Sequence, residues 1–144
     1  MNHQLLDNLH SRIRLVNFAP SSSPEEIKKM KSVSPIEIPD DYLSLITMGT
    51  NFEFQIDQKS CFRIWGAEGC LEMNEAYHIQ ENLGDAWAIG DDEGSSALIY
   101  VLKNDERGLY LSGFGWLDPE DITFTARSLT DIVTLGAGLD VLVY

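Results

Sequence analysis

The sequence predicts a single α+β domain built on a mainly antiparallel β-sheet. Its 144 residues have the length of one ordinary domain, and 44% hydrophobic with 23% charged residues is the composition of a folded globular protein. After Gly49 the hydrophobic spacing changes from a helical period to a period of two, and the helical period returns at Gly66. Helices before, within and after a run of strands joined by short turns indicate one α+β domain over residues 1–144, with a sheet covered mainly on one face.

Two helices are predicted in the N-terminal part of the chain. Apolar residues at helical spacing predict the first one, from Gln4 to Val16. Ser23, Pro24 and Glu26 then provide an N-cap, a proline at the first helical position and an acid three residues after the cap. This pattern predicts a second helix that ends at Lys31.

Two prolines delimit the next segment. Pro35 ends the second helix, and residues 36–39 are expected to be extended because a residue before proline is disfavoured in the helical region. Pro39 then opens a third helix, and Gly49 supplies its C-terminal cap. The core face of this helix carries three apolar residues: Tyr42, Leu45 and Ile46.

A β-hairpin and a fourth helix follow. Phe52, Phe54 and Ile56 alternate with polar residues, and a second apolar run after a short break places a turn over residues 57–61. Helical spacing then predicts a helix from Gly66 to Tyr77. Its inward face is expected to carry Ala67, Cys70, Leu71 and Tyr77.

Three further strands and a last helix complete the predicted domain. The strands are expected at Ala86–Gly90, Ala97–Lys103 and Gly108–Ser112, with the last two joined as a hairpin across residues 104–108. Ser128 is a second N-cap candidate, and the helix that it opens is expected to end at two glycines, Gly136 and Gly138. Residues 141–144 are apolar, and their spacing assigns them to no element.

The charge distribution limits the possible partners. The formal net charge is −13, and the segment from Glu37 to Glu93 holds thirteen acids against two bases. Because nucleic-acid affinity depends on Lys and Arg neutralising phosphates, such a surface repels nucleic acid and also anionic membranes. A basic protein partner or a cation is favoured instead, although acidity also serves solubility alone.

The cysteines and the apolar runs indicate a cytoplasmic protein. Cys61 and Cys70 are separated by eight residues without a third candidate ligand beside them, so buried free thiols in a reducing cytoplasm are expected rather than a disulfide or a zinc site. The first residues lack the basic head and apolar core of a secretion signal, and the longest apolar run, Ala97–Leu102, is too short to span a membrane. No cofactor is predicted.

Recognisable catalytic patterns are absent from the sequence. It has no Gly-x-Ser-x-Gly elbow, no phosphate-binding loop ending in Gly-Lys-Ser/Thr and no Gly-x-Gly-x-x-Gly between a strand and a helix. His3, His10 and His78 lie at unrelated spacings, and nothing singles out an acid/base pair among the 23 carboxylates. We therefore expect a protein without enzymatic activity.

Three consecutive acids, Asp91, Asp92 and Glu93, lie between Gly90 and Gly94. They could coordinate a hard cation such as calcium. Their consecutive spacing argues against this, because an EF-hand loop places its ligands on alternate positions and ends with a distant Glu. A second interpretation is a tight solvated turn, with glycines at positive φ and acids that cap backbone N–H groups. A third is a negatively charged contact for a basic protein.

The helix predicted over 66–77 carries an acidic stripe. Glu68, Glu72 and Glu75 share one face, where like charges at this spacing destabilise an isolated helix slightly. A solvated face usually mixes charges of both signs, so the uniform stripe favours a partner surface over simple solvation. Trp65 and Trp87 are expected to pack in the core or on the sheet.

Six short motifs follow one another over residues 20–135 in an order that resembles the SUKH superfamily. They are Ser23–Ile27, Ile38–Tyr42 followed by Met48–Gly49, Trp65–Gly66 with the acidic helix after it, Ile89–Gly94, Gly108–Tyr110 and Ala126–Ile132. The superfamily's namesakes include a fungal cell-wall assembly regulator and many small bacterial proteins. Ile38-Pro39 and Met48-Gly49 depart from its usual Leu-Pro and Asn-Gly.

The resemblance implies a SUKH-like domain with a central, mainly antiparallel sheet. It also implies an immunity protein that binds and neutralises a bacterial toxin, often a nuclease. A nuclease tends to be basic around its substrate cleft, and an acidic protein could occupy that cleft as a mimic of phosphate. Four residues are then expected to build the fold: Pro39, Gly49, Trp65 and Gly90. Six acids are expected to contact the toxin: Glu68, Glu72, Glu75, Asp91, Asp92 and Glu93. A scaffold that joins signalling or cell-wall proteins is the alternative function.

Overall fold

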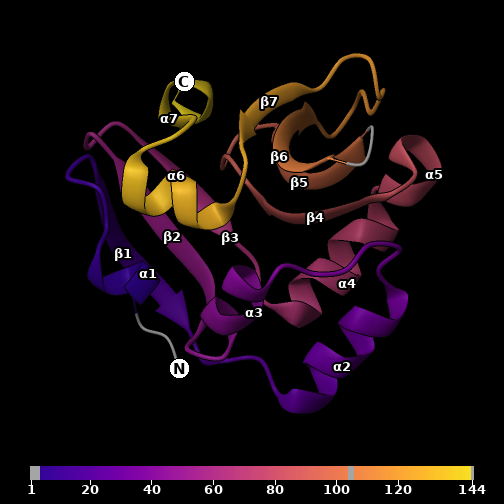
Figure 1. Ribbon diagram of the computed structural model, residues 1–144, viewed down its shortest axis with the longest axis horizontal. Helices are drawn as coiled ribbons and strands as arrows, with labels where there is room; N and C mark the ends of the chain where they lie inside the picture. The colour runs from indigo at the N-terminus through magenta and orange to yellow at the C-terminus, as the bar shows by residue number, and fades with distance from the viewer. Residues whose placement is uncertain (1–3, 104–105, 144) are drawn as a thin grey trace.

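One antiparallel sheet runs through the whole protein, and its strands lie in chain order. The computed structural model describes residues 4–103 and 106–143 (Figure 1), and in these residues seven strands pair in the order β1 to β7. The strands are β1 (Ile13–Ala19), β2 (Thr50–Ile56), β3 (Ser60–Ile64), β4 (Ala86–Asp91), β5 (Ser96–Lys103), β6 (Glu106–Gly113) and β7 (Thr123–Ala126). The helices are α1 (Gln4–Asp7), α2 (Pro24–Val33), α3 (Asp40–Ile46), α4 (Ala67–Ala76), α5 (Ile79–Leu83), α6 (Leu129–Leu135) and α7 (Leu139–Leu142). The predicted α+β class is confirmed.

Most of the predicted turns and helix starts are present. Ser23 caps α2, because its hydroxyl accepts a hydrogen bond from the Glu26 N–H while the Glu26 carboxylate accepts one from the Ser23 N–H. Ser128 caps α6 through the N–H of Asp131, and Gly136 ends that helix in the left-handed region. Sequence signals that act within a few residues therefore predicted these helix ends correctly.

Two hairpins agree with the prediction. β2 and β3 are joined by a tight turn in which Asp57 and Gln58 have positive φ. β5 and β6 pair along their whole length, from Ser96 with Gly113 to Lys103 with Glu106. The turn predicted over 104–108 is therefore shorter, since β6 starts at Glu106, and residues 104–105 lie outside the described part.

The strands of the sheet differ in whether one or both of their faces are buried. In β2 and β3 every second side chain is buried, and the alternate ones lie on a partly exposed face. We call this the open face; it carries Glu53, Gln55, Cys61 and Arg63. In β4 all six residues are buried, with α4 and α5 in contact with this strand. The prediction that one face of the sheet is covered is thus confirmed for β2 and β3. It is wrong for β4, which is covered on both faces.

The helix predicted from Gln4 to Val16 is wrong over most of its length. α1 ends at Asp7, and β1 begins at Ile13, where it pairs with Ile56 of β2. The β-branched residues of this segment favour a strand, and pairing with β2 provides backbone hydrogen bonds that an isolated helix does not outweigh. The partner strand is distant in sequence, so the local spacing did not reveal it.

Several smaller elements also differ from the prediction. α3 ends with a right-handed C-cap at Thr47, so Gly49 is not its cap; a Cβ on Gly49 would lie 3.0 Å from the Ala19 carbonyl oxygen, which explains the glycine. Tyr77 is 39% exposed and packs against Phe114 with tilted rings whose centroids lie 4.3 Å apart, rather than facing inward. Besides β1, the elements β7, α5 and α7 were not predicted; α7 contains Val141 and Leu142 of the unassigned tail.

Both predicted core tryptophans are in place, and one of the two thiols is buried as predicted. Trp65 and Trp87 are buried, as expected. Both cysteines are free thiols, and Cys70 is buried as predicted. The predicted burial of Cys61 is wrong, because its position in β3 places it on the partly exposed open face. Burial raises the pKa of Cys70 to about 12, so this thiol stays protonated at neutral pH.

Candidate functional site

The strongest candidate site is an acidic groove between α2 and α4. Glu68 and Glu72 of the predicted stripe lie there with Glu26 of α2, around a hollow of about 310 Å³. Polar side chains such as Ser21 and Asn51 complete its lining, and none of the described residues that line it is basic. We refer to this hollow, with its three carboxylates, as the acidic groove.

The local fold explains why the three carboxylates meet. The N-terminus of α4 is held by the Ala67 N–H, which donates a 2.9 Å hydrogen bond to the hydroxyl of Ser22, just before α2. Gly66 packs so closely on Thr50 that an added Cβ would lie 2.2 Å from the threonine methyl group. α2 and α4 therefore pack side by side, and their acidic residues face one hollow.

Glu26 belongs to the site as well as to the helix cap. Its carboxylate accepts a 2.8 Å hydrogen bond from the Ser23 N–H, and this bond is the main reason that its pKa is lowered. Glu26 therefore remains charged at neutral pH beside Glu68 and Glu72. The local sequence pattern indicates only a capping role for Glu26, because its place in the groove depends on the packing of α2 against α4.

Glu75 is separated from the other two residues of the stripe. It lines a neighbouring hollow that also includes the basic residue Lys29 and His78. All three stripe residues are exposed, as a charged contact requires. The structure thus divides the predicted stripe between two hollows: Glu68 and Glu72 line one without a basic residue among its described lining, and Glu75 lines one that includes Lys29.

Asp91 and Asp92, where β4 ends and the next turn begins, accept hydrogen bonds from groups within the protein. Asp91 and Asp92 are each only 8% exposed. Asp91 accepts hydrogen bonds from the indole Nε1 of Trp65 at 2.8 Å and from the Glu93 N–H at 2.8 Å. Asp92 accepts from the N–H groups of Gly94 and Ser96. The expectation that these acids cap backbone groups is confirmed, and their carboxylates are not displayed as surface contacts.

The glycines of this turn have a different role from the one predicted. Neither Gly90 nor Gly94 has a positive φ; the residue in the left-handed region is Glu93, with φ 59°. Gly90 is required for close approach, because a Cβ there would lie 2.1 Å from the Arg63 carbonyl oxygen. Gly90 is therefore a structural residue, like the buried Trp65 and like Pro39, which precedes α3 in an extended conformation.

No model of a known protein family matches the sequence. A search of curated proteins gave no match either. Within residues 4–103 and 106–143, none of the helices combines the length and the apolar character that crossing a membrane requires.

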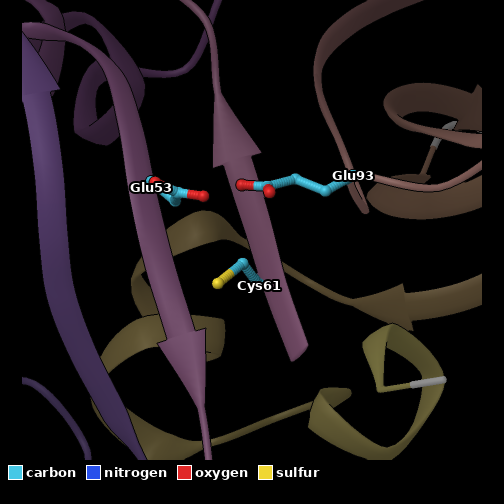
Figure 2. A group of neighbouring side chains, drawn as sticks. All are labelled: Glu53, Cys61 and Glu93. Carbon is cyan, nitrogen blue, oxygen red and sulfur yellow. The ribbon is translucent and has the colours of Figure 1, made fainter. Parts of the chain in front are cut away.

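A second cluster of ionisable side chains lies on the open face of the sheet. Figure 2 shows Glu53 of β2, Cys61 of β3 and Glu93 of the turn after β4 pointing toward one another. One donor atom from each lies within 4.8 Å of the others. The guanidinium of Arg63 already supplies a positive charge 3.7 Å from the Glu93 carboxylate, so we do not assign these residues as metal ligands.

Proposed function

We propose that this protein is a cytoplasmic, non-enzymatic immunity protein that binds a basic toxin through the acidic groove. The observation that carries the proposal is the meeting of Glu26, Glu68 and Glu72 around one polar hollow without a basic residue among its described lining. Carboxylates in such a setting form charge-assisted hydrogen bonds with Lys or Arg side chains. The resemblance to the SUKH superfamily supports a toxin as the partner.

Charge beyond the groove supports the same proposal. The formal net charge of −13 steers a basic partner toward the protein and raises the rate of encounter. A nuclease presents basic side chains where it holds phosphate, so the groove would occupy those side chains and block the substrate. Glu75 lies beside the groove on the same helix, where it would extend the contact.

A calorimetric titration tests the proposal directly. The titrant is a catalytically inactive toxin encoded by the neighbouring gene, at low and at physiological salt. We expect tight one-to-one binding that weakens as salt rises, because screening weakens interactions between exposed charges. The absence of binding to a folded neighbour would contradict the immunity function and favour the scaffold function.

A pair of double variants separates the groove from net charge. Glu68→Lys with Glu72→Lys is expected to weaken binding by at least about tenfold, since it places two cations in the groove. Glu37→Lys with Glu120→Lys changes the net charge equally at exposed positions outside the groove, and we expect less than about threefold weakening. Equal weakening by both double variants would show that the groove is not the contact site.

A further inference from the structure

The carboxylates of Glu53 and Glu93 meet on the open face, where one oxygen of Glu93 lacks a hydrogen-bond donor. Glu93 reaches this face from the turn after β4 (Figure 2). Its side chain is only 19% exposed. Its Oε2 atom is fully buried and has no hydrogen-bond partner in the described part of the chain. The Nη2 atom of Arg63 lies 3.7 Å from this oxygen, beyond hydrogen-bonding distance.

A buried carboxylate oxygen without a donor is unfavourable in its charged form. The described groups that act on Glu93 come from each element around it: Glu53 of β2, Cys61 and Arg63 of β3, and Asp91 at the end of β4. Only Arg63 is positive, and it is partly exposed, so it offsets the two neighbouring acids incompletely. A proton on one of the two carboxyl groups removes the repulsion and provides the missing donor.

We propose that Glu53 and Glu93 share a proton in mildly acidic solution, and that loss of this proton releases the Glu93 side chain from the open face. The pair is then a pH-sensitive latch. The backbone of the turn keeps its position in both states, because Asp91 and Asp92 hold it through the N–H groups of residues 93, 94 and 96. Only the side chain of Glu93 moves, and the open face gains one negative charge.

The electrostatic surroundings set the pH range of the latch near neutrality. Burial raises the pKa of Glu93 to about 7, and hydrogen bonding with Glu53 and repulsion by it add to this rise. A folded-state pKa above the unfolded value of 4.5 gives a contribution to stability that is complete below pH 4.5. This contribution is lost as the pH rises through about 7, when the folded protein gives up its extra proton.

Urea unfolding at a series of pH values from about 5 to about 8.5 tests the stability effect. In the wild type, the unfolding equilibrium constant is expected to rise by at least about tenfold more over this range than in Glu93→Gln, whose neutral amide cannot titrate. Above neutral pH, Glu93→Gln is expected to be the more stable protein. Glu37→Gln, at an exposed site, is the matched control and should follow the wild type.

A carboxyl carbon-13 NMR titration of the wild type tests the same proposal without a variant. We expect the Glu93 carboxyl group to titrate with a midpoint near 7. In Glu53→Gln the midpoint is expected to fall by about one pH unit, because the neighbouring charge is removed. A wild-type midpoint near 4.5, or parallel stability curves for the wild type and Glu93→Gln, would overturn the proposal.

Discussion

Asn74 of α4 binds the backbone of Ala88 in β4 as a neighbouring strand would. Its Nδ2 donates a 2.9 Å hydrogen bond to the Ala88 carbonyl oxygen, and its Oδ1 accepts one of 2.9 Å from the Ala88 N–H. β3 pairs with β4 only at Gly90 and Asp91, so it does not reach Ala88. The amide of Asn74 thus satisfies two backbone groups that the sheet leaves without a partner.

Replacing Asn74 is therefore expected to destabilise the protein strongly. Asn74→Ala leaves the N–H and the carbonyl of Ala88 buried without partners, and we expect the free energy of unfolding to fall by about 3 kcal/mol. Urea unfolding measures this change. The matched control is Asn82→Ala. The exposed Asn82 amide donates a hydrogen bond to the His78 carbonyl oxygen, and its removal should change the free energy of unfolding by no more than about 0.5 kcal/mol. An equally small effect at Asn74 would contradict the structural role.

A methyl group at Gly90 is expected to be more damaging than one at a glycine in open space. The Cβ of Gly90→Ala would overlap the Arg63 carbonyl oxygen, so β3 and β4 must separate where they pair. We expect thermal unfolding to reveal a loss of about 3 kcal/mol or more. Gly115→Ala, which meets nothing within 4 Å, should leave the melting temperature unchanged or slightly higher. Similar effects of the two substitutions would refute the close-approach argument.

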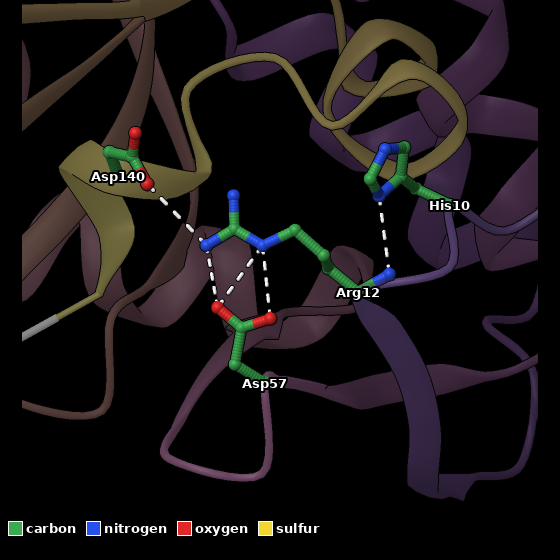
Figure 3. A network of polar contacts seen from close by, with 4 residues as sticks. All are labelled: His10, Arg12, Asp57 and Asp140. Atoms are coloured by element: carbon green, nitrogen blue, oxygen red, sulfur yellow. Dashed lines mark hydrogen bonds and ion pairs between the residues drawn. The ribbon is translucent and has the colours of Figure 1, made fainter.

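The ion pair of Arg12 with Asp57 predicts a loss of stability in acid. Figure 3 shows the guanidinium of Arg12, which precedes β1, on the carboxylate of Asp57 in the β2–β3 turn; Nε lies 2.9 Å from Oδ1. This hydrogen bond lowers the pKa of Asp57 below its usual 3.8. A lowered folded-state pKa gives stability that is present above pH 3.8 and is lost as the pH falls through the lowered value.

Asp57→Asn is therefore expected to be less stable than the wild type at neutral pH, and the difference should shrink in strong acid. Urea unfolding at several pH values measures both effects. Asp140→Asn is the control. The Asp140 carboxylate is 93% exposed, and its contact with the same guanidinium is longer, at 3.4 Å, so we expect no measurable change in stability. A constant difference between Asp57→Asn and the wild type at all pH values would argue against the ion pair.

Local sequence signals predicted most of the fold. The capping box at Ser23, the cap at Ser128 and the β2–β3 hairpin each depend on residues close together in the chain. β1 was missed because its assignment depends on Ile56 and Phe54 of a strand far along the sequence. Spacing alone cannot distinguish a short apolar segment that pairs with a distant strand from a short helix.

The candidate site was predicted in part. Helical spacing correctly placed Glu68 and Glu72 on one exposed face. It could not add Glu26, which joins them only through the packing of α2 on α4. The sequence also predicted Asp91 and Asp92 as charged surface contacts. In the structure their carboxylates accept hydrogen bonds from an indole and from backbone N–H groups in the turn.

Composition and local pattern were enough to establish the α+β class, the excess of negative charge and the acidic face of α4. These properties depend on counts and on spacings within a few residues, where backbone geometry and capping act. Tertiary structure alone decided which acids share the groove, which are buried in the turn, and that Glu53 meets Glu93. The physical reason is that burial and charge proximity depend on which distant segments pack together, and packing is a property of the whole chain.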